Sequence, residues 1–195
     1  MYTLCYNFFI QLDHKLFFSI NQWHHPWVDR LVCYVTSTCF WIPLYVVLLV
    51  LIVITFRRQA WQPLLITVGL LIICDQFASS LVKPWVQRLR PCWHADWGDM
   101  VHVVGQYHGV YGFISSHAAN TFGIATFLWL LLRKKYPVIQ WLFLWAFVVS
   151  YARVYGGVHY PLDVILGAVS GVGWAHMVFR CYLRLARLCS KTSKL

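Results

Sequence analysis

The chain has 195 residues, of which 60% are hydrophobic and 11% are charged, and its mean hydropathy is +0.61. A soluble domain carries about 25% charged residues, so this composition excludes a soluble protein and predicts an all-α, polytopic membrane bundle. The formal net charge of +10 is compatible with a nucleic-acid partner. The cations alternate with apolar segments, however, as in membrane proteins, so we expect no nucleic acid.

The N-terminal segment, residues 1–30, is apolar but is interrupted by Asp13, His14 and Lys15. It lacks the basic start and the small-residue cleavage site of a signal peptide. We expect an amphipathic helix that lies in the outer membrane interface and ends in a turn at residues 23–27. A sixth membrane span is the alternative.

Five apolar segments approach the roughly 20 residues that a helix needs to cross a bilayer. We place these spans at residues 31–56, 61–81, 117–132, 137–155 and 161–179, the third being the shortest. They predict a membrane domain over residues 31–180, followed by a basic cytoplasmic tail over residues 181–195.

The Lys and Arg residues are distributed unevenly around these spans. Residues 57–58, 133–135 and the tail from Arg180 onward would all lie on one side of a five-span chain, and the positive-inside rule makes that side cytoplasmic. The outer side receives Lys15 and Arg30, and also Lys83, Arg88, Arg90 and Arg153, which gather at span ends near His159. Because the rule disfavours outer cations, this cluster predicts a functional use for them.

The end of the second span carries charges of both signs. Asp75 is an intramembrane carboxylate, for which we expect a structural pairing with an arginine such as Arg88; a functional role is the alternative. Lys83, Arg88 and Arg90 then precede Pro91. Lysine is a point charge and arginine a planar fork that matches phosphate oxygens, so this run can bind lipid headgroups or a specific phosphate.

The outer loop over residues 92–114 is rich in potential metal ligands. It contains His94, Asp96, Asp99, His102 and His108. Their spacing matches no common metal motif, and neither does that of the seven cysteines. We therefore expect no metal and no cofactor, and we interpret the loop as a lid or a substrate-selecting rim.

Two further stretches predict a site. Ser115 and Ser116 suit a helix N-cap, and the first turn of such a helix, which carries His117, binds anions through its free N–H groups. Near the start of the last span, Pro161 suits a first helical turn, which puts Asp163 within reach of His159. A carboxylate that accepts the Nδ1 proton leaves Nε2 free as a nucleophile. Side chains that only extend toward water are the alternative.

Together these stretches resemble the signature of the type 2 phosphatidic acid phosphatase superfamily, the membrane lipid phosphatases related to vanadium haloperoxidases. The resemblance covers roughly residues 30–180. Its first motif, Lys-x6-Arg-Pro, is matched by Lys83, Arg90 and Pro91; its second, Pro-Ser-Gly-His, by Ser115 and His117; and its third, Ser-Arg-x5-His-x3-Asp, by Arg153, His159 and Asp163. The departures, Ile114, Ser116 and Ala152, concern the phosphate loop and leave the nucleophile and the acid in place.

The resemblance implies a division of roles. The phosphate-binding residues would be Lys83, Arg90, Ser115, Ser116 and Arg153. His159 would attack phosphorus and form a phosphohistidine, Asp163 would orient it, and His117 would protonate the leaving oxygen and then activate water. No metal is implied, because ammonium and guanidinium groups supply the positive charge.

The implied function is hydrolysis of a lipid phosphomonoester or diphosphate in a bacterial inner membrane, at an extracytoplasmic site. Lipid A phosphate and undecaprenyl diphosphate are the first candidates, and phosphatidylglycerol phosphate and phosphatidic acid are the alternatives. A vanadate-dependent peroxidase is disfavoured by the apolar spans, and a non-enzymatic lipid-binding protein by the joint presence of His117, His159 and Asp163. Beyond the bilayer and the lipid, we expect no obligate protein partner.

Overall fold

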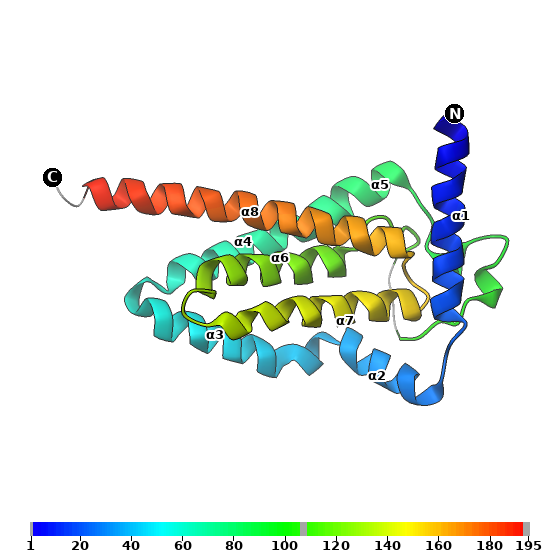
Figure 1. Cartoon of the computed structure of the whole chain (residues 1–195), viewed down its shortest axis with the longest axis horizontal. Coiled ribbons are helices and arrows are strands. Elements are labelled where there is room, and N and C mark those ends of the chain that lie inside the picture. The colour runs from blue at the N-terminus through cyan, green and yellow to red at the C-terminus, as the bar shows by residue number, and fades with distance from the viewer. Residues whose placement is uncertain (1, 106–108, 193–195) are drawn as a thin grey trace.

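The computed structural model describes residues 2–105 and 109–192, with side chains described for residues 8–105 and 109–185. His108 and Lys194 therefore lie outside the described residues. The chain forms the predicted helical bundle (Figure 1). Its α-helices are α1 (Tyr2–Asn21), α2 (Pro26–Thr36), α3 (Ile42–Phe56), α4 (Trp61–Gln76), α5 (Lys83–Val86), α6 (Ser116–Leu132), α7 (Leu142–Tyr155) and α8 (Pro161–Thr192).

Four helical segments of the described chain are long and apolar enough to cross a membrane: Thr38–Gln59, Trp61–Val86, Pro137–Tyr155 and Pro161–Leu185. The predicted third span is the shorter apolar helix α6, whose 17 residues extend about 25 Å at the usual rise per residue. The predicted start of the first span at residue 31 is wrong. The chain leaves the helical conformation at Ser37, so α2 is a separate helix and the span begins at Thr38.

Helix α6 lies at the centre of the bundle and packs against α4, α7 and α8. Its closest neighbour is α8, because two glycines let the backbones approach each other, as small residues do in membrane helices. A Cβ atom at Gly171 would overlap the carbonyl oxygen of Ala119, and one at Gly167 would lie 2.5 Å from the carbonyl oxygen of Ser115. This packing fixes the N-terminus of α6 beside the first turns of α8.

Helix α1 crosses one end of the bundle at a steep angle to the long helices (Figure 1). Asp13, Phe17 and Asn21, spaced four residues apart, form its buried stripe, as expected for one face of a helix. The opposite side exposes apolar residues, among them Phe8 and Leu12. This arrangement is compatible with the expected interfacial helix, which stays a prediction beside the alternative of a sixth span.

The cations predicted to be cytoplasmic and the outer cations predicted to have a function lie at opposite ends of the bundle. The turn at residues 57–58, the connection at residues 133–135 and the C-terminal part of α8 lie at one end (Figure 1). The α5 segment, the start of α8 and helix α1 lie at the other. The predicted basic tail continues α8 without a break as far as Thr192.

Candidate active site

Lys83 and the two arginines that follow it are positioned by a distorted helix end and a short bridge. A π-helical segment, Phe77–Val82, continues α4 into α5, and α5 ends at Gln87 in the left-handed conformation. The extended segment that follows is fixed by hydrogen bonds from Arg90 N to Val110 O and from Gly112 N to Arg88 O, both 2.9 Å. Residues two apart in an extended segment point to the same side, and both arginines reach residues 158–163.

His159 is presented by a tight connection between α7 and α8. Gly157 adopts φ +76°, and a Cβ atom there would lie 2.7 Å from His102 O, so the turn requires glycine. Pro161 begins α8 as predicted, and Asp163 lies in its first turn. The connection leaves the His159 side chain buried, with 1% of its surface exposed.

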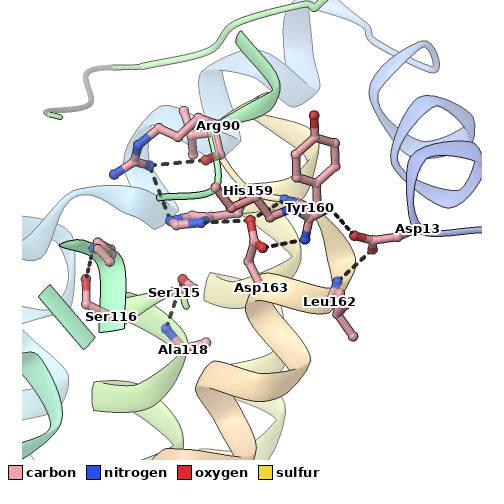
Figure 2. A network of polar contacts seen from close by, with 12 residues as sticks. Asp13, Arg90, Ser115, Ser116, Ala118, His159, Tyr160, Leu162 and Asp163 are labelled. Atoms are coloured by element: carbon pink, nitrogen blue, oxygen red, sulfur yellow. Dashed lines mark hydrogen bonds and ion pairs between the residues drawn. The ribbon is translucent and has the colours of Figure 1, made fainter. Parts of the chain in front are cut away.

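The neighbours of His159 determine which of its nitrogens carries the proton (Figure 2). Its Nε2 lies 3.3 Å from Arg90 Nη1, and because a guanidinium can only donate, Nε2 must accept. The proton therefore lies on Nδ1, 3.6 Å from Asp163 Oδ2. Burial, and then the charges of Arg90, Arg153 and Lys83, hold the pKa of His159 well below its usual value. The imidazole is neutral, and the lone pair of the nitrogen that would attack is directed at Arg90.

Asp163 is fully buried, and both of its carboxylate oxygens are bound. Oδ2 accepts the backbone N–H of Tyr160 at 3.0 Å, and Oδ1 accepts Arg88 Nη1 at 2.7 Å. Its backbone carbonyl accepts the N–H of Ser115 at 2.9 Å. This last bond joins the start of α8 directly to the start of α6.

The start of α6 supplies the other predicted phosphate ligands. Ser115 is buried and caps the helix by accepting the N–H of Ala118 at 3.4 Å, which leaves its hydroxyl proton free to donate. Lys83 Nζ lies 3.4 Å from Ser116 Oγ and 3.4 Å from Ser79 Oγ. His117 and Ser116 line a cavity between α3, α4 and α6.

Arg153 has a buried donor with no partner among the described residues. Its side chain is 7% exposed, and its Nε makes no hydrogen bond there. Buried polar groups are nearly always paired, and an unpaired guanidinium donor near His159 suits an anion. Arg153 lies close enough to lower the pKa of His159, so it belongs to the same cluster as Arg90 and Lys83.

The predicted pairing of Asp75 with Arg88 is wrong. Arg88 forms its ion pairs with Asp163 and with Asp13 on α1, at 2.7 and 2.6 Å. Asp75 instead lines the cavity that contains Ser116 and His117. Sequence reasoning treated Asp13 only as an interruption of an apolar segment, although a carboxylate in such a segment signals a buried partner.

Two histidines of the outer loop, His94 and His102, make structural contacts. His94 stacks on Trp97 with ring centroids 3.4 Å apart, and His102 Nε2 lies 3.1 Å from Asp29 Oδ2. Within residues 2–105 and 109–192, no three His, Cys, Asp or Glu side chains are placed to hold a metal ion. The loop packs against α1, since Trp97 also contacts His14 at 4.9 Å between ring centroids.

Relatives of known activity match most of the chain. It is 36% identical over 190 residues to a lipid A 4'-phosphatase of Bacteroides thetaiotaomicron, with 95% of this chain and 84% of that protein covered. It is 32% identical over 183 residues to a lipid A 4'-phosphatase of Porphyromonas gingivalis, with 90% and 75% covered.

Two solved structures have the same fold. Aquifex aeolicus LpxE superposes with a TM-score of 0.63 at 29% identity, covering 87% of this chain and 95% of that one. A PAP2-type phosphatidylglycerolphosphate phosphatase of Bacillus subtilis gives 0.69 at 20% identity, covering 91% and 88%, which supports the fold alone. The PAP2 superfamily model matches residues 64–187, which include all three motif segments. The chain therefore belongs to the PAP2 superfamily and is a membrane lipid phosphate phosphatase.

Proposed function

We propose that the chain removes a phosphate from lipid A, without a metal ion and through a phosphohistidine formed on His159. The observation that carries the proposal is the buried, neutral imidazole whose Nε2 faces Arg90 beside the unpaired donor of Arg153. The lipid A 4'-phosphatases among the relatives support the choice of substrate.

The phosphate would bind among three cations and the start of α6. A phosphomonoester carries nearly two negative charges at neutral pH, which Lys83, Arg90 and Arg153 can balance. Ser116, next to Lys83, and the free N–H groups of α6 add donors. Phosphoryl transfer depends mainly on such positioning and charge stabilisation.

The reaction would then proceed in two steps. In the first, His159 Nε2 forms a bond to phosphorus and the bond from phosphorus to the lipid oxygen breaks. His117, which takes up a proton when the phosphate dianion binds beside it, gives that proton to the lipid oxygen. Asp163 stabilises the positive charge on the ring through Nδ1. In the second, His117 takes a proton from water, the water oxygen bonds to phosphorus, and the N–P bond breaks to release inorganic phosphate.

The cavity between α3, α4 and α6 supports a lipid leaving group. Its volume is about 680 Å³, and apolar side chains of α3 and α4 form most of its wall. Leu49, Leu65 and Val68 line it and are also exposed on the outside of the bundle, so it opens toward the bilayer. An acyl chain in this cavity would bring the attached headgroup to His117.

The test is phosphate release by the purified protein from detergent micelles of lipid A, undecaprenyl diphosphate, phosphatidylglycerol phosphate and phosphatidic acid. We expect lipid A to react fastest, and mass spectrometry of the product to show which phosphate was removed. Faster release from undecaprenyl diphosphate would reassign the substrate. Peroxidase turnover with vanadate, bromide and peroxide, without phosphatase activity, would overturn the proposal.

The nucleophile is tested by His159→Ala, with His176→Ala as the matched control. His176 is exposed on α8 and bonds only to its own helix at Val172 O. We expect His159→Ala to lower kcat by about three orders of magnitude or more, as loss of a nucleophile usually does, and His176→Ala to behave as wild type. Turnover by His159→Ala within about tenfold of wild type would exclude His159 as the nucleophile.

Metal independence is a separate prediction. Phosphate release should be unchanged after dialysis against EDTA, because the proposed site uses side-chain cations in place of a divalent ion. The measurement is the initial rate before and after dialysis, with magnesium, manganese and zinc each added back. A rate that falls with EDTA and returns with one of these ions contradicts the prediction.

A further inference from the structure

We propose that Arg88 and Asp13 are positioning residues of this reaction: Arg88 fixes the Asp163 carboxylate that faces Nδ1 of His159, and Asp13 holds Arg88 in place. Helix α1 is then a working part of the active site. The inference rests on the proposed function, in which His159 is the nucleophile.

The guanidinium of Arg88 joins two carboxylates from distant parts of the chain. Its Nη1 donates to Asp163 Oδ1 at 2.7 Å, and its Nη2 donates to Asp13 Oδ2 at 2.6 Å. Asp163 is fully buried and Asp13 is 5% exposed. Buried ion pairs contribute only when their geometry is good and the remaining atoms are satisfied, and the other oxygens of both carboxylates do have donors.

These contacts close into a ring. Asp13 Oδ1 accepts the backbone N–H of Leu162 at 2.8 Å (Figure 2), and Leu162 directly precedes Asp163. The ring therefore runs from Asp13 to Arg88, to Asp163, and back along the backbone to Leu162. With Oδ1 held by Arg88 and Oδ2 by the N–H of Tyr160, the carboxylate plane is fixed. Rotation that would turn Oδ2 away from His159 is blocked.

Arg88 is placed poorly for binding phosphate. Both of its Nη atoms are used by carboxylates, and its guanidinium lies over the ring of Tyr160, 4.0 Å from the ring centre. A guanidinium between two carboxylates has no positive charge to spare for a third anion. Arg153, in contrast, has a free donor among the described residues. Arg88 would act on the reaction through Asp163 and His159.

The experiment compares Arg88→Ala, Arg88→Lys, Asp13→Asn and the double variant Arg88→Ala/Asp13→Asn with wild type. The readouts are kcat and KM on the best lipid of the panel, Ki for orthovanadate and for inorganic phosphate, and the thermal midpoint in detergent. Arg153→Ala is the comparison for a phosphate ligand. Arg30→Ala, on α2, is the neutral control, since Arg30 lies over Trp27.

We expect Arg88→Ala to lower kcat about 100-fold or more, as removal of an orienting group does, with both Ki values within about threefold of wild type. Arg88→Lys should recover a large part of kcat, because it keeps the charge and one donor. Asp13→Asn should lower kcat about tenfold, and the double variant should be no worse than Arg88→Ala, since the two act in series. Arg153→Ala should raise both Ki values.

Three results would overturn the inference. A folded Arg88→Ala with unchanged kcat would leave Arg88 a structural residue, and a rise in Ki as large as that of Arg153→Ala would make it a phosphate ligand. If Arg88→Ala does not fold, unchanged kcat in folded Arg88→Lys and Asp13→Asn would decide against the proposal. An inactive wild type would remove the proposed function itself, a failure distinct from the other three.

Discussion

Arg90 controls His159 in two ways. As a donor to Nε2, it keeps the proton of the imidazole on Nδ1, toward Asp163. As a charge, it helps to hold the pKa of His159 low after burial has already lowered it. The nitrogen proposed as the nucleophile is thus unprotonated before any substrate binds, and a phosphate oxygen that attracts Arg90 would expose it.

The low pKa of His159 makes a prediction about stability. In the folded state His159 stays neutral, whereas in the unfolded state its imidazole takes up a proton near pH 6.5. The contribution of His159 to the free energy of unfolding is therefore complete above that pH. This contribution is lost as the pH falls below it. Between about pH 7 and about pH 5, the thermal midpoint of wild type should fall further than that of His159→Gln, which cannot take up this proton.

The measurement is thermal unfolding in one detergent at both pH values, and the other histidines, common to both proteins, cancel in the difference. Equal falls for wild type and His159→Gln would show that the folded imidazole titrates normally. That result would contradict the neutral, buried nucleophile.

The contact between α6 and α8 places the proposed acid, His117, and the proposed nucleophile, His159, relative to each other. Ser115 caps α6 and His117 lies in its first turn, while Asp163 belongs to α8 and His159 lies two residues before α8 begins. Gly167 and Gly171 bring the two backbones together over this region. A change of their spacing would therefore separate the catalytic groups without altering any of them.

Two glycines of α8 provide a matched test. A Cβ atom at Gly171 overlaps the backbone of Ala119, whereas one at Gly173 meets nothing within 4 Å. Gly171→Ala should destabilise the fold by about 1–3 kcal/mol, as overpacking does, and should lower kcat by more than KM changes. Gly173→Ala should match wild type in thermal midpoint and rate. If both variants behave alike, the close helix contact is not what positions the site.

The break at Ser37 shows what hydropathy cannot predict about an element. Residues 31–56 are almost continuously apolar, so composition gives one span. The chain can leave the helix there because side chains satisfy the freed carbonyls: Trp41 Nε1 donates to Val35 O at 2.8 Å, and Thr36 Oγ1 donates to Val32 O at 2.8 Å. These bonds depend on local geometry, which a window average does not contain.

At the scale of the whole molecule, the orientation in the membrane is a prediction that rests on the two ends of the bundle. Most of the cations without a role in the site lie at one end, and the proposed phosphate cluster lies at the other. By the positive-inside rule, the site faces away from the cytoplasm. Cys92, next to Pro91 of the first motif, would then be extracytoplasmic, and Cys189 in the basic part of the chain would be cytoplasmic.

The check is labelling of single-cysteine variants in intact spheroplasts with a membrane-impermeant thiol reagent. The variant that keeps Cys92 should react, and the variant that keeps Cys189 should react only after lysis. Cys5 is removed from both, since its side depends on the N-terminal segment. Labelling of Cys189 alone would place the site in the cytoplasm.

Sequence reasoning predicted the helical membrane bundle and the family. The apolar segments must satisfy their own backbone, and few residue types can serve as phosphate ligand, nucleophile and proton donor in a fixed order. It did not predict the ring through Asp13, Arg88 and Asp163. Each of its side-chain bonds joins residues 75 or more positions apart, and no periodicity or motif spacing indicates such a contact. The roles assigned to His117, His159 and the cations remain predictions.

The cavity between α3, α4 and α6 would let the lipid product leave by a different route from inorganic phosphate. The dephosphorylated lipid would move sideways past Leu65 and Val68 into the hydrocarbon. Inorganic phosphate is charged and would leave into water instead. The lipid alcohol could thus be gone before water reaches the phosphohistidine. Because the lipid alcohol would leave into the bilayer and the phosphate into water, the two half-reactions would be separated in space as well as in time. Dilution of the alcohol into the bilayer would also make the phosphoryl transfer hard to reverse.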